Sequence, residues 1–255
     1  MRNFKMILQY EGTRFKGWQK QESTDNTIQG KLEALLTKMV GEKVEVQGSG
    51  RTDAGVHALG QVANFHADTQ MSTDEILQYM NTYLPEDIAV ISLEEVPERF
   101  HSRLNAKGKT YCYRVIHSKL PHVFDRRYVH MVEGEPDVEA MREAAKYLIG
   151  THDFKAFTSS KKGKKSTVRR VDEIRIEKVE STSMLFSKEQ DEIRFTYSGN
   201  GFLYHMVRIM TGTLLEAGMH KRKPEEIAEI LDSGCREKAG ELVPAKGLTL
   251  MEVRY

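Results

Sequence analysis

The order of strand-like and helix-like segments in residues 4–96 is the feature that most limits the folds open to this chain. Short apolar runs with a two-residue alternation are typical of strands, and apolar residues three and four apart are typical of helices. In chain order these patterns predict a strand at 4–10, a helix at 27–40, strands at 43–47 and 61–66, a helix at 72–83 and a strand at 88–96. The resulting βαββαβ order is that of a ferredoxin-like α+β unit with a mainly antiparallel sheet.

The second half of the chain repeats this order with additions. Its patterns predict a strand at 110–117, a helix at 137–149, strands at 168–179 and 192–198, a long apolar helix at 201–217, a short helix at 224–231 and a closing strand at 248–255. We therefore expect two ferredoxin-like halves, residues 1–104 and 105–255, joined within the linker-like stretch 97–109. One large α+β domain with a fortuitous order of elements is the alternative.

The composition of the chain excludes several classes of protein. Among 255 residues, 38 Lys and Arg against 37 Asp and Glu leave a net charge of +1, so bulk charge alone would not bind nucleic acid. No apolar run approaches the roughly 18 residues of a membrane-spanning helix, and the N-terminal residues lack the pattern of a signal peptide. Cysteine occurs only at Cys112 and Cys235. We expect a cytoplasmic protein without disulfides that does not enter a membrane.

Positive charge is clustered although the total is balanced. One segment without an acidic residue, 159–170, carries Lys161, Lys162, Lys164, Lys165, Arg169 and Arg170. A second basic stretch holds Arg99, His101, Arg103, Lys107 and Lys109, and a third covers 221–223. One such run is ordinarily a solvated loop, but three in a near-neutral chain indicate a surface for RNA or DNA. For Tyr111 and Tyr113, which follow Lys109 on one strand face, base stacking and core packing are both open.

A polar, glycine-rich loop separates two predicted strands of the first half. Its sequence, GSGRTDAGVHALG at 48–60, has Asp53 where the dinucleotide-binding pattern requires glycine, and it lacks the G-K-[ST] ending of a P-loop. In this loop the Asp53 carboxylate lies among small residues and beside Arg51. Small neighbours would let a substrate come close to the carboxylate. A turn in which Asp53 only caps a backbone amide is the alternative.

The sequence contains no recognised metal-binding or Ser-His-Asp pattern. The nine histidines form no H-E-x-x-H pair, two distant cysteines do not build a zinc site, and G-x-S-x-G is absent, so we predict no metal site. His205 is interpreted as a packed or capping residue. Arg208 lies within the apolar helix predicted at 201–217, where it requires a carboxylate partner unless its side chain reaches solvent at the polar edge of the helix.

As a set, these residues resemble the tRNA pseudouridine synthase A (TruA) family. The resemblance covers nearly the whole chain, and its most specific block is SGRTDAGVHALGQ at 49–61. The other blocks are Tyr10, Gly12, Gly17-Trp18-Gln19, Gln21, Leu84-Pro85, FHSR, KGKTYCYR, GFLYHMVRIMTG and PAKGLTL.

The resemblance implies an isomerase that converts uridine to pseudouridine at positions 38, 39 and 40 of the tRNA anticodon stem-loop. It implies a homodimer that needs no metal or organic cofactor, with an active-site cleft between the halves. By carry-over, Asp53 is the nucleophile, Tyr111 lies against the target base and Arg208 is the partner of Asp53. The target nucleotide would have to leave the RNA helix, and Arg51 is then placed to fill the vacated space or to hold a phosphate. The basic stretches would bind the RNA backbone.

Two rival interpretations belong to other classes of function. The first is a non-catalytic RNA-binding protein of two ferredoxin-like modules, for which the RNP aromatic signature is missing from the sequence. The second is an enzyme that acts on a free nucleoside, which would leave the basic stretches without a role.

Overall fold

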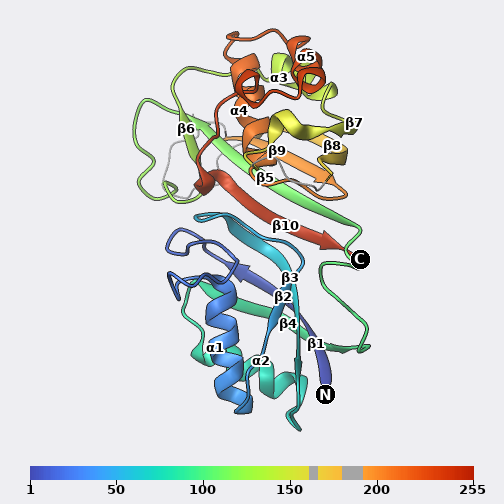
Figure 1. The fold of residues 1–255 in the computed structure, drawn as a ribbon. Coiled ribbons are helices and arrows are strands. Elements are labelled where there is room, and N and C mark those ends of the chain that lie inside the picture. The colour runs from blue at the N-terminus through green and yellow to red at the C-terminus, as the bar shows by residue number, and fades with distance from the viewer. Residues whose placement is uncertain (161–165, 180–191) are drawn as a thin grey trace. The chain divides into compact units, whose positions relative to one another are not determined.

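The computed structural model describes residues 1–160, 166–179 and 192–255, and the chain divides into two compact units (Figure 1). The first unit consists of Met1–Lys107 together with Thr249–Tyr255, and the second of Gly108–Leu248. Each contains a mostly antiparallel sheet and helices, so the predicted α+β class is confirmed. The closing strand, predicted for the second half, groups with the first unit from Thr249 onward. The domain limits 1–104 and 105–255 stay a prediction.

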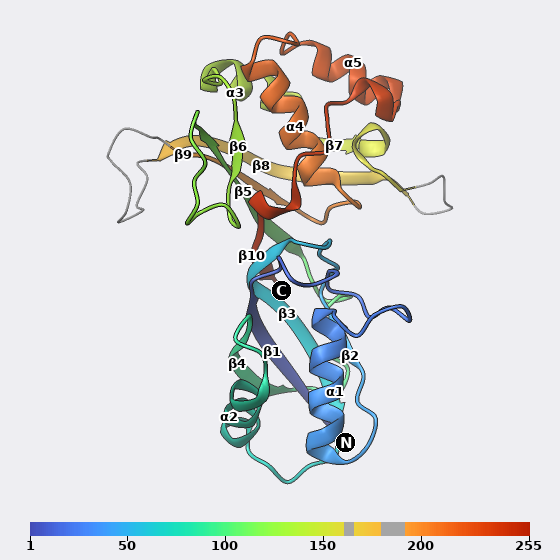
Figure 2. The ribbon, with the colours of Figure 1, turned by 90° about the vertical axis from the view of Figure 1, so that its left-hand side faces the viewer.

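The first unit has the βαββαβ order that its sequence pattern predicts. Its elements are β1 (Arg2–Tyr10), α1 (Ile28–Val40), β2 (Val46–Gly48), β3 (His57–Ala67), α2 (Thr73–Tyr83) and β4 (Ile88–Val96). The strands lie in the order β4-β1-β3-β2, and each neighbouring pair is antiparallel. Both helices lie on one side of this sheet (Figures 1 and 2). β10 (Leu248–Arg254) adds a parallel neighbour to β3, with Thr249 opposite His57.

Local sequence signals set the ends of the two helices in this unit. The Thr27 hydroxyl accepts a hydrogen bond from the Gly30 amide at the start of α1, and Gly41 ends that helix in the left-handed conformation, with φ 81°. At α2, Ser72 and Glu75 form a capping box. The helices cover a core of aromatic and aliphatic side chains: Phe4, Met6, Leu8, Phe65, Ile28, Leu32, Leu36, Ile76 and Met80.

The second unit is a larger α+β arrangement with extra short elements. It contains β5 (Gly108–His117), β6 (His130–Val132), α3 (Val138–Lys146), β7 (Gly150–Asp153), β8 (Val168–Val179), β9 (Glu192–Gly199), α4 (Met206–Gly218) and α5 (Glu226–Ser233). Three short 3-10 helices accompany them, η1 (Phe154–Phe157), η2 (Arg236–Lys238) and η3 (Ala245–Gly247). The strands run β5-β9-β8-β7 with antiparallel pairing, and β6 is parallel to β5. The three α-helices lie on one side of the sheet (Figure 2).

Several elements of the chain differ from their sequence predictions. The helix predicted from Gly201 begins only at Met206, because His205 has the left-handed φ of 66° and cannot belong to a right-handed helix. β3 begins at His57, inside the segment predicted as loop, because His57 and Ala58 pair with β10. The short strands β6 and β7 have no sequence prediction; segments of three and four residues are too short for a periodic pattern.

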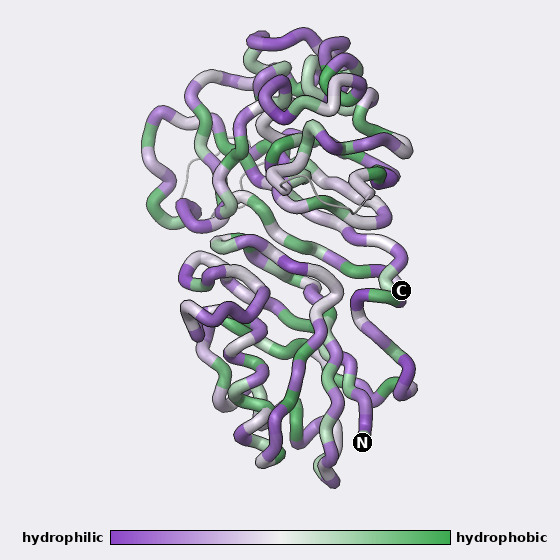
Figure 3. The backbone as a smooth tube through the Cα atoms, viewed as in Figure 1, coloured by the Kyte–Doolittle hydropathy of each residue, from purple (hydrophilic) through white to green (hydrophobic). Residues whose placement is uncertain are grey.

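The hydropathy of the chain follows the strands closely. On β1, Phe4, Met6, Leu8 and Tyr10 are buried and alternate with less buried residues, and Figure 3 shows apolar and polar residues interspersed along the strands of both units. Among the described residues, no helix is long and apolar enough to span a membrane. Cys112 and Cys235 are free cysteines.

Candidate active site

Asp53 stands at the first position of a tight turn between β2 and β3. The Val56 amide donates a 3.1 Å hydrogen bond to the Asp53 carbonyl, and Gly55 at the third position has φ 80°. A type II turn requires a positive φ at its third position, which explains why glycine occupies position 55 of R-T-D-A-G. The Asp53 side chain is half-buried, and Arg51 two residues earlier is exposed.

Buried polar side chains fix the backbone on the N-terminal side of Asp53. The Tyr10 and Thr52 hydroxyl oxygens lie 2.8 Å apart, and the Gln61 amide donates to the Tyr10 hydroxyl and to the Gly50 carbonyl at 3.3 and 3.1 Å. The Ser49 hydroxyl donates to the Gln61 Oε1 at 2.7 Å. Tyr10 and Gln61 come from the adjacent strands β1 and β3, so the sheet itself positions the loop.

The chain segment after β1 packs against the same loop at van der Waals distance. A Cβ at Gly12 would lie 2.0 Å from the Val56 carbonyl oxygen, which only glycine avoids. Gly17 has φ 91°, and a Cβ there would lie 2.8 Å from the Thr52 carbonyl oxygen. That carbonyl accepts a 3.0 Å hydrogen bond from the Trp18 amide. The Gly12 and Gly17 positions thus let two backbone segments meet beside Asp53.

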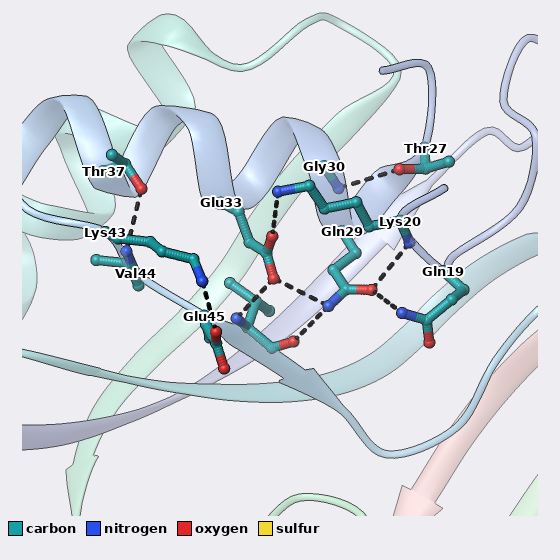
Figure 4. A network of polar contacts seen from close by, with 11 residues as sticks. Gln19, Lys20, Thr27, Gln29, Gly30, Glu33, Thr37, Lys43, Val44 and Glu45 are labelled. Atoms are coloured by element: carbon teal, nitrogen blue, oxygen red, sulfur yellow. Dashed lines mark hydrogen bonds and ion pairs between the residues drawn. The ribbon is translucent and has the colours of Figure 1, made fainter. Parts of the chain in front are cut away.

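A polar network anchors this second segment to α1 (Figure 4). Glu33 is buried and accepts hydrogen bonds from the Val46 amide at 3.1 Å and from the Gln29 side chain at 2.9 Å. Its other oxygen pairs with the Lys20 ammonium at 3.0 Å. The Gln29 Oε1 accepts from the Gln19 side chain at 2.7 Å and from the Lys20 amide at 3.0 Å. Residues 18–20 are therefore held against both α1 and the start of β2.

Tyr111 lies in the middle of β5, opposite Tyr197 of β9. Its side chain is 8% exposed, and its ring meets the Phe202 ring edge-on at a centroid distance of 5.4 Å. The structure is compatible with core packing of Tyr111, and its role in base stacking stays a prediction. Lys109, two residues before it, is half-buried at the start of the same strand.

Arg208 lies in the first turn of α4 and is half-buried. Its Nε donates to the Val243 carbonyl oxygen at 2.8 Å, so a backbone carbonyl outside the helix orients the guanidinium. α4 itself is fixed against residues 239–243, because the Thr213 hydroxyl accepts from the Gly240 amide at 2.9 Å. Both sequence interpretations of Arg208 stay open: a carboxylate partner, or a side chain that reaches solvent at the polar edge of the helix.

The predicted site residues are distributed over the two units. Asp53, Arg51 and the exposed Arg103 belong to the first unit. Tyr111, Lys109, Arg208, Arg169 and Arg170 belong to the second. Arg170 pairs with Asp172 at 2.7 Å. The other predicted RNA-binding residues, Lys161, Lys162, Lys164 and Lys165, lie outside the described residues.

Two features of this region have no counterpart in the site prediction. Gln61 closes the hydrogen-bond network behind the Asp53 loop, although the sequence placed it only at the end of a motif. Its position on the buried face of β3 would have indicated a structural polar group. Phe202 contacts Tyr111, a pairing between distant segments that no sequence spacing reveals. Within the described part of the chain, no group of three His, Cys, Asp or Glu is arranged to hold a metal.

The family model and the sequence relatives of this chain agree in one class, the tRNA pseudouridine synthases. The family described as tRNA pseudouridine synthase matches residues 6–105 and 144–255. A tRNA pseudouridine synthase A 2 of Bacillus cereus (strain ZK / E33L) is 43% identical over 255 residues, with 100% of both chains covered. A tRNA pseudouridine synthase A 1 of Clostridium tetani (strain Massachusetts / E88) is 46% identical over the same full lengths.

Among solved structures, a Cbf5-Nop10-Gar1 complex is similar at a TM-score of 0.39 and 10% identity, covering 97% of this chain and 48% of that chain. That likeness is too low to bear on the fold. The sequence matches decide the assignment: the chain belongs to the tRNA pseudouridine synthase family, in its TruA branch.

Proposed function

We propose that this chain isomerises uridine to pseudouridine in tRNA, and that its targets are positions 38, 39 and 40 of the anticodon stem-loop. Membership of the tRNA pseudouridine synthase family supports the reaction, and full-length similarity to two tRNA pseudouridine synthases A supports the substrate. The observation that carries the proposal is the Asp53 turn, in which buried hydrogen bonds and close glycine contacts fix the backbone that presents one half-buried carboxylate.

The proposed reaction rearranges one nucleotide without gain or loss of atoms. The bond between ribose C1′ and uracil N1 breaks, the base turns, and a new bond forms between C1′ and C5. A proton leaves C5 and N1 ends protonated, so no oxidant or second substrate is required. Asp53 acts as the nucleophile in this scheme. Attack on C1′, attack on C6 and a glycal route that starts with proton loss from C2′ all remain compatible with one carboxylate.

The proposed roles of the other site residues follow from their chemistry. Arg208 supplies a positive charge that favours the ionised form of the Asp53 carboxylate. Tyr111 lies against the target base after the nucleotide has left the helix, a step that costs a few kcal/mol and least at a stem end. Arg51 fills the vacated space or binds a phosphate, which its exposure permits.

Binding of the tRNA backbone is the proposed role of the basic residues. They are Arg103, Lys109, Lys161, Lys162, Lys164, Lys165, Arg169 and Arg170. Clustered cations on a chain of net charge +1 bind phosphates while acidic surfaces elsewhere limit nonspecific association. We further propose a homodimer that works in the cytoplasm.

Sequencing for pseudouridine tests the proposal directly. Purified protein is incubated with tRNA, and pseudouridine is mapped by reverse-transcription stops at carbodiimide adducts. The expected result is new stops at positions 38, 39 and 40 with the wild type and none with Asp53→Asn, which keeps the size of the side chain and removes its charge. The exposed carboxylate Asp68 provides the matched control, Asp68→Asn, which should keep full activity.

Each rival function has its own outcome in this experiment. RNA binding without any pseudouridine would favour a non-catalytic RNA-binding protein. Conversion of free uridine as fast as of a stem-loop RNA would favour a nucleoside enzyme. Mass spectrometry must first exclude deamidation of the introduced asparagine to aspartate in the Asp53→Asn variant. Pseudouridine formation by that variant would then contradict Asp53 as the nucleophile and indicate another carboxylate.

A further inference from the structure

Two aromatic rings are stacked at the start of α4, and the outer one is open to solvent. The Tyr204 side chain is 53% exposed. Its ring centroid lies 3.6 Å from that of His205, with 27° between the ring planes. An exposed tyrosine alone would be unremarkable, since single apolar side chains are common on protein surfaces. Here the second ring supports the first from behind and limits its motion.

The backbone that carries these rings is fixed by hydrogen bonds to the segment after η1. The Tyr204 carbonyl oxygen accepts from the Thr158 hydroxyl at 2.9 Å and from the Ser159 amide at 3.4 Å. His205 is held at φ 66°, a conformation that residues other than glycine rarely adopt. Such strain persists only where the surrounding structure enforces it, and it is concentrated at functional sites. The chain thus holds an exposed ring pair in one orientation.

The loop that carries Tyr204 is joined to both described ends of the basic segment 159–170. On one side Thr158 and Ser159 bond to Tyr204. On the other, Asn200 and Arg170 exchange two hydrogen bonds of 3.0 Å, from the Asn200 amide to the Arg170 carbonyl and from the Arg170 amide to the Asn200 side chain. Of the described cations in this segment, Arg170 is exposed, pairs with Asp172 at 2.7 Å, and lies beside the loop through these backbone contacts with Asn200. A fixed exposed aromatic next to cations is the combination that binds single-stranded nucleic acid.

We infer that Tyr204 is a stacking platform for an unpaired base of the RNA substrate, next to the proposed target nucleotide. The inference rests on the proposed function and adds a substrate-contacting residue to it. Tyr204 precedes Arg208 by four residues in the sequence, and Phe202, two residues before Tyr204 in the same loop, contacts the proposed base-contacting residue Tyr111. Stacking needs only the π face of the ring, so the platform accepts any base.

Binding of an anticodon stem-loop RNA to three variants tests this inference. Tyr204→Leu keeps apolar volume and removes the π face, and it should weaken binding, measured by fluorescence polarisation, about 10-fold to 100-fold. Tyr204→Phe keeps the face and should bind within about twofold of wild type. The control is Tyr83→Leu, because Tyr83 is also exposed and ring-paired, with Tyr79 at 4.7 Å, but lies in the first unit, outside the basic segment. It should bind like wild type.

Kinetics and assembly measurements separate the platform from other roles of Tyr204. The Tyr204→Leu change should raise KM while the single-turnover rate at saturating RNA stays within about twofold. Equal binding by Tyr204→Leu and wild type would overturn the inference, as would an equal loss in the Phe variant. A shift in oligomeric state by ultracentrifugation, with RNA affinity per protomer unchanged, would assign the ring to a protein interface instead. RNA binding is measured without turnover, so its result is independent of the pseudouridine assay. The binding data can therefore contradict the stacking role of Tyr204 while isomerase activity is confirmed, and activity can be absent while stacking is confirmed.

Discussion

The hydroxyl oxygens of Tyr10 and Thr52 lie 2.8 Å apart in the interior of the first unit, one residue before the Asp53 turn. Tyr10 is 4% exposed, and burial raises the pKa of its hydroxyl to about 12. The hydroxyl therefore keeps its proton at neutral pH and serves as a hydrogen-bond donor as well as an acceptor. This pair connects the first strand of the sheet to the loop that presents the proposed nucleophile.

Replacement of Tyr10 by phenylalanine should loosen that loop without unfolding the protein. Tyr10→Phe leaves the buried Thr52 hydroxyl and the Gln61 amide short of one partner, which should lower the free energy of unfolding by about 1–3 kcal/mol. Pseudouridine formation should slow while tRNA affinity stays near wild type, because the substitution leaves every proposed RNA-binding side chain unchanged. Urea unfolding and single-turnover assays measure the two effects. Tyr83→Phe, on an exposed tyrosine, is the control, and equal behaviour of the two variants would contradict a role for the Tyr10 hydroxyl.

The hydroxyl of Tyr111 is expected to take part in proton transfer. Tyr111→Phe keeps the ring and its edge-on packing with Phe202, so the fold and the tRNA affinity should be preserved. Loss of a proton-transfer group should reduce the rate of isomerisation by about 10²–10⁴. The Tyr111→Ala variant should be as slow, and less stable because of the cavity it leaves. Normal turnover by the Phe variant would show that Tyr111 serves as a platform only.

The lysine-rich segment should account for part of the salt dependence of tRNA binding. Changing Lys161, Lys162, Lys164 and Lys165 to Ala should weaken binding and flatten the plot of log affinity against log salt. The slope should fall by up to about 0.9 for each duplex phosphate that the variant no longer neutralises. Lys38→Ala combined with Lys43→Ala, on exposed lysines of the first unit, is the control and should leave the slope unchanged. An unchanged slope in the fourfold variant would identify a solvated loop.

Periodicity predicts the long elements of this fold because their side chains have one buried face. β4 and β8 occupy the predicted ranges, and α1 and α2 begin within a residue of the predicted start. Periodicity fails where backbone geometry overrides composition. The apolar run from Gly201 has helical spacing, yet the left-handed His205 delays α4 to Met206 and leaves Tyr204 in a loop. Single-residue conformations of this kind have no hydropathy signal.

The sequence predicts which carboxylate the candidate site contains, but not the contacts that hold its loop in place. Asp53 among glycines indicates a substrate-contacting carboxylate, and the turn with Gly55 gives that glycine a physical reason. The contacts that hold the turn come from β1, β3 and the segment after β1, which are distant in sequence. Such contacts depend on strand register, and the register was not deducible from the spacing of apolar residues.

A buried carboxylate between two arginines joins β5 and β9 in the second unit. Glu192 is 2% exposed and accepts hydrogen bonds from Arg114 at 2.8 and 2.6 Å and from Arg194 at 2.6 Å. Burial alone would raise the pKa of Glu192, but the hydrogen bonds and charges of the two arginines outweigh it and hold the pKa below its usual range. Because the folded-state pKa is lowered, this group stabilises the fold above the unfolded-state pKa of about 4.3. The stabilisation is lost as the pH falls through the folded-state value.

Neutralising this carboxylate should destabilise the protein in a pH-dependent way. Glu192→Gln should lower the free energy of unfolding at pH 7 by about 1–3 kcal/mol, less than for a fully buried pair because Arg114 and Arg194 are about a third exposed. The difference from wild type should narrow as the pH falls below the unfolded-state pKa of about 4.3 and through the lower folded-state pKa of Glu192. Urea unfolding between pH 7 and pH 3 measures both effects. The exposed pair of Glu139 and Arg142 on α3 supplies the control, since Glu139→Gln should change the free energy by less than about 0.5 kcal/mol. A Glu192→Gln difference that stays constant across this pH range would show that side-chain packing, and not charge, makes Glu192 stabilising.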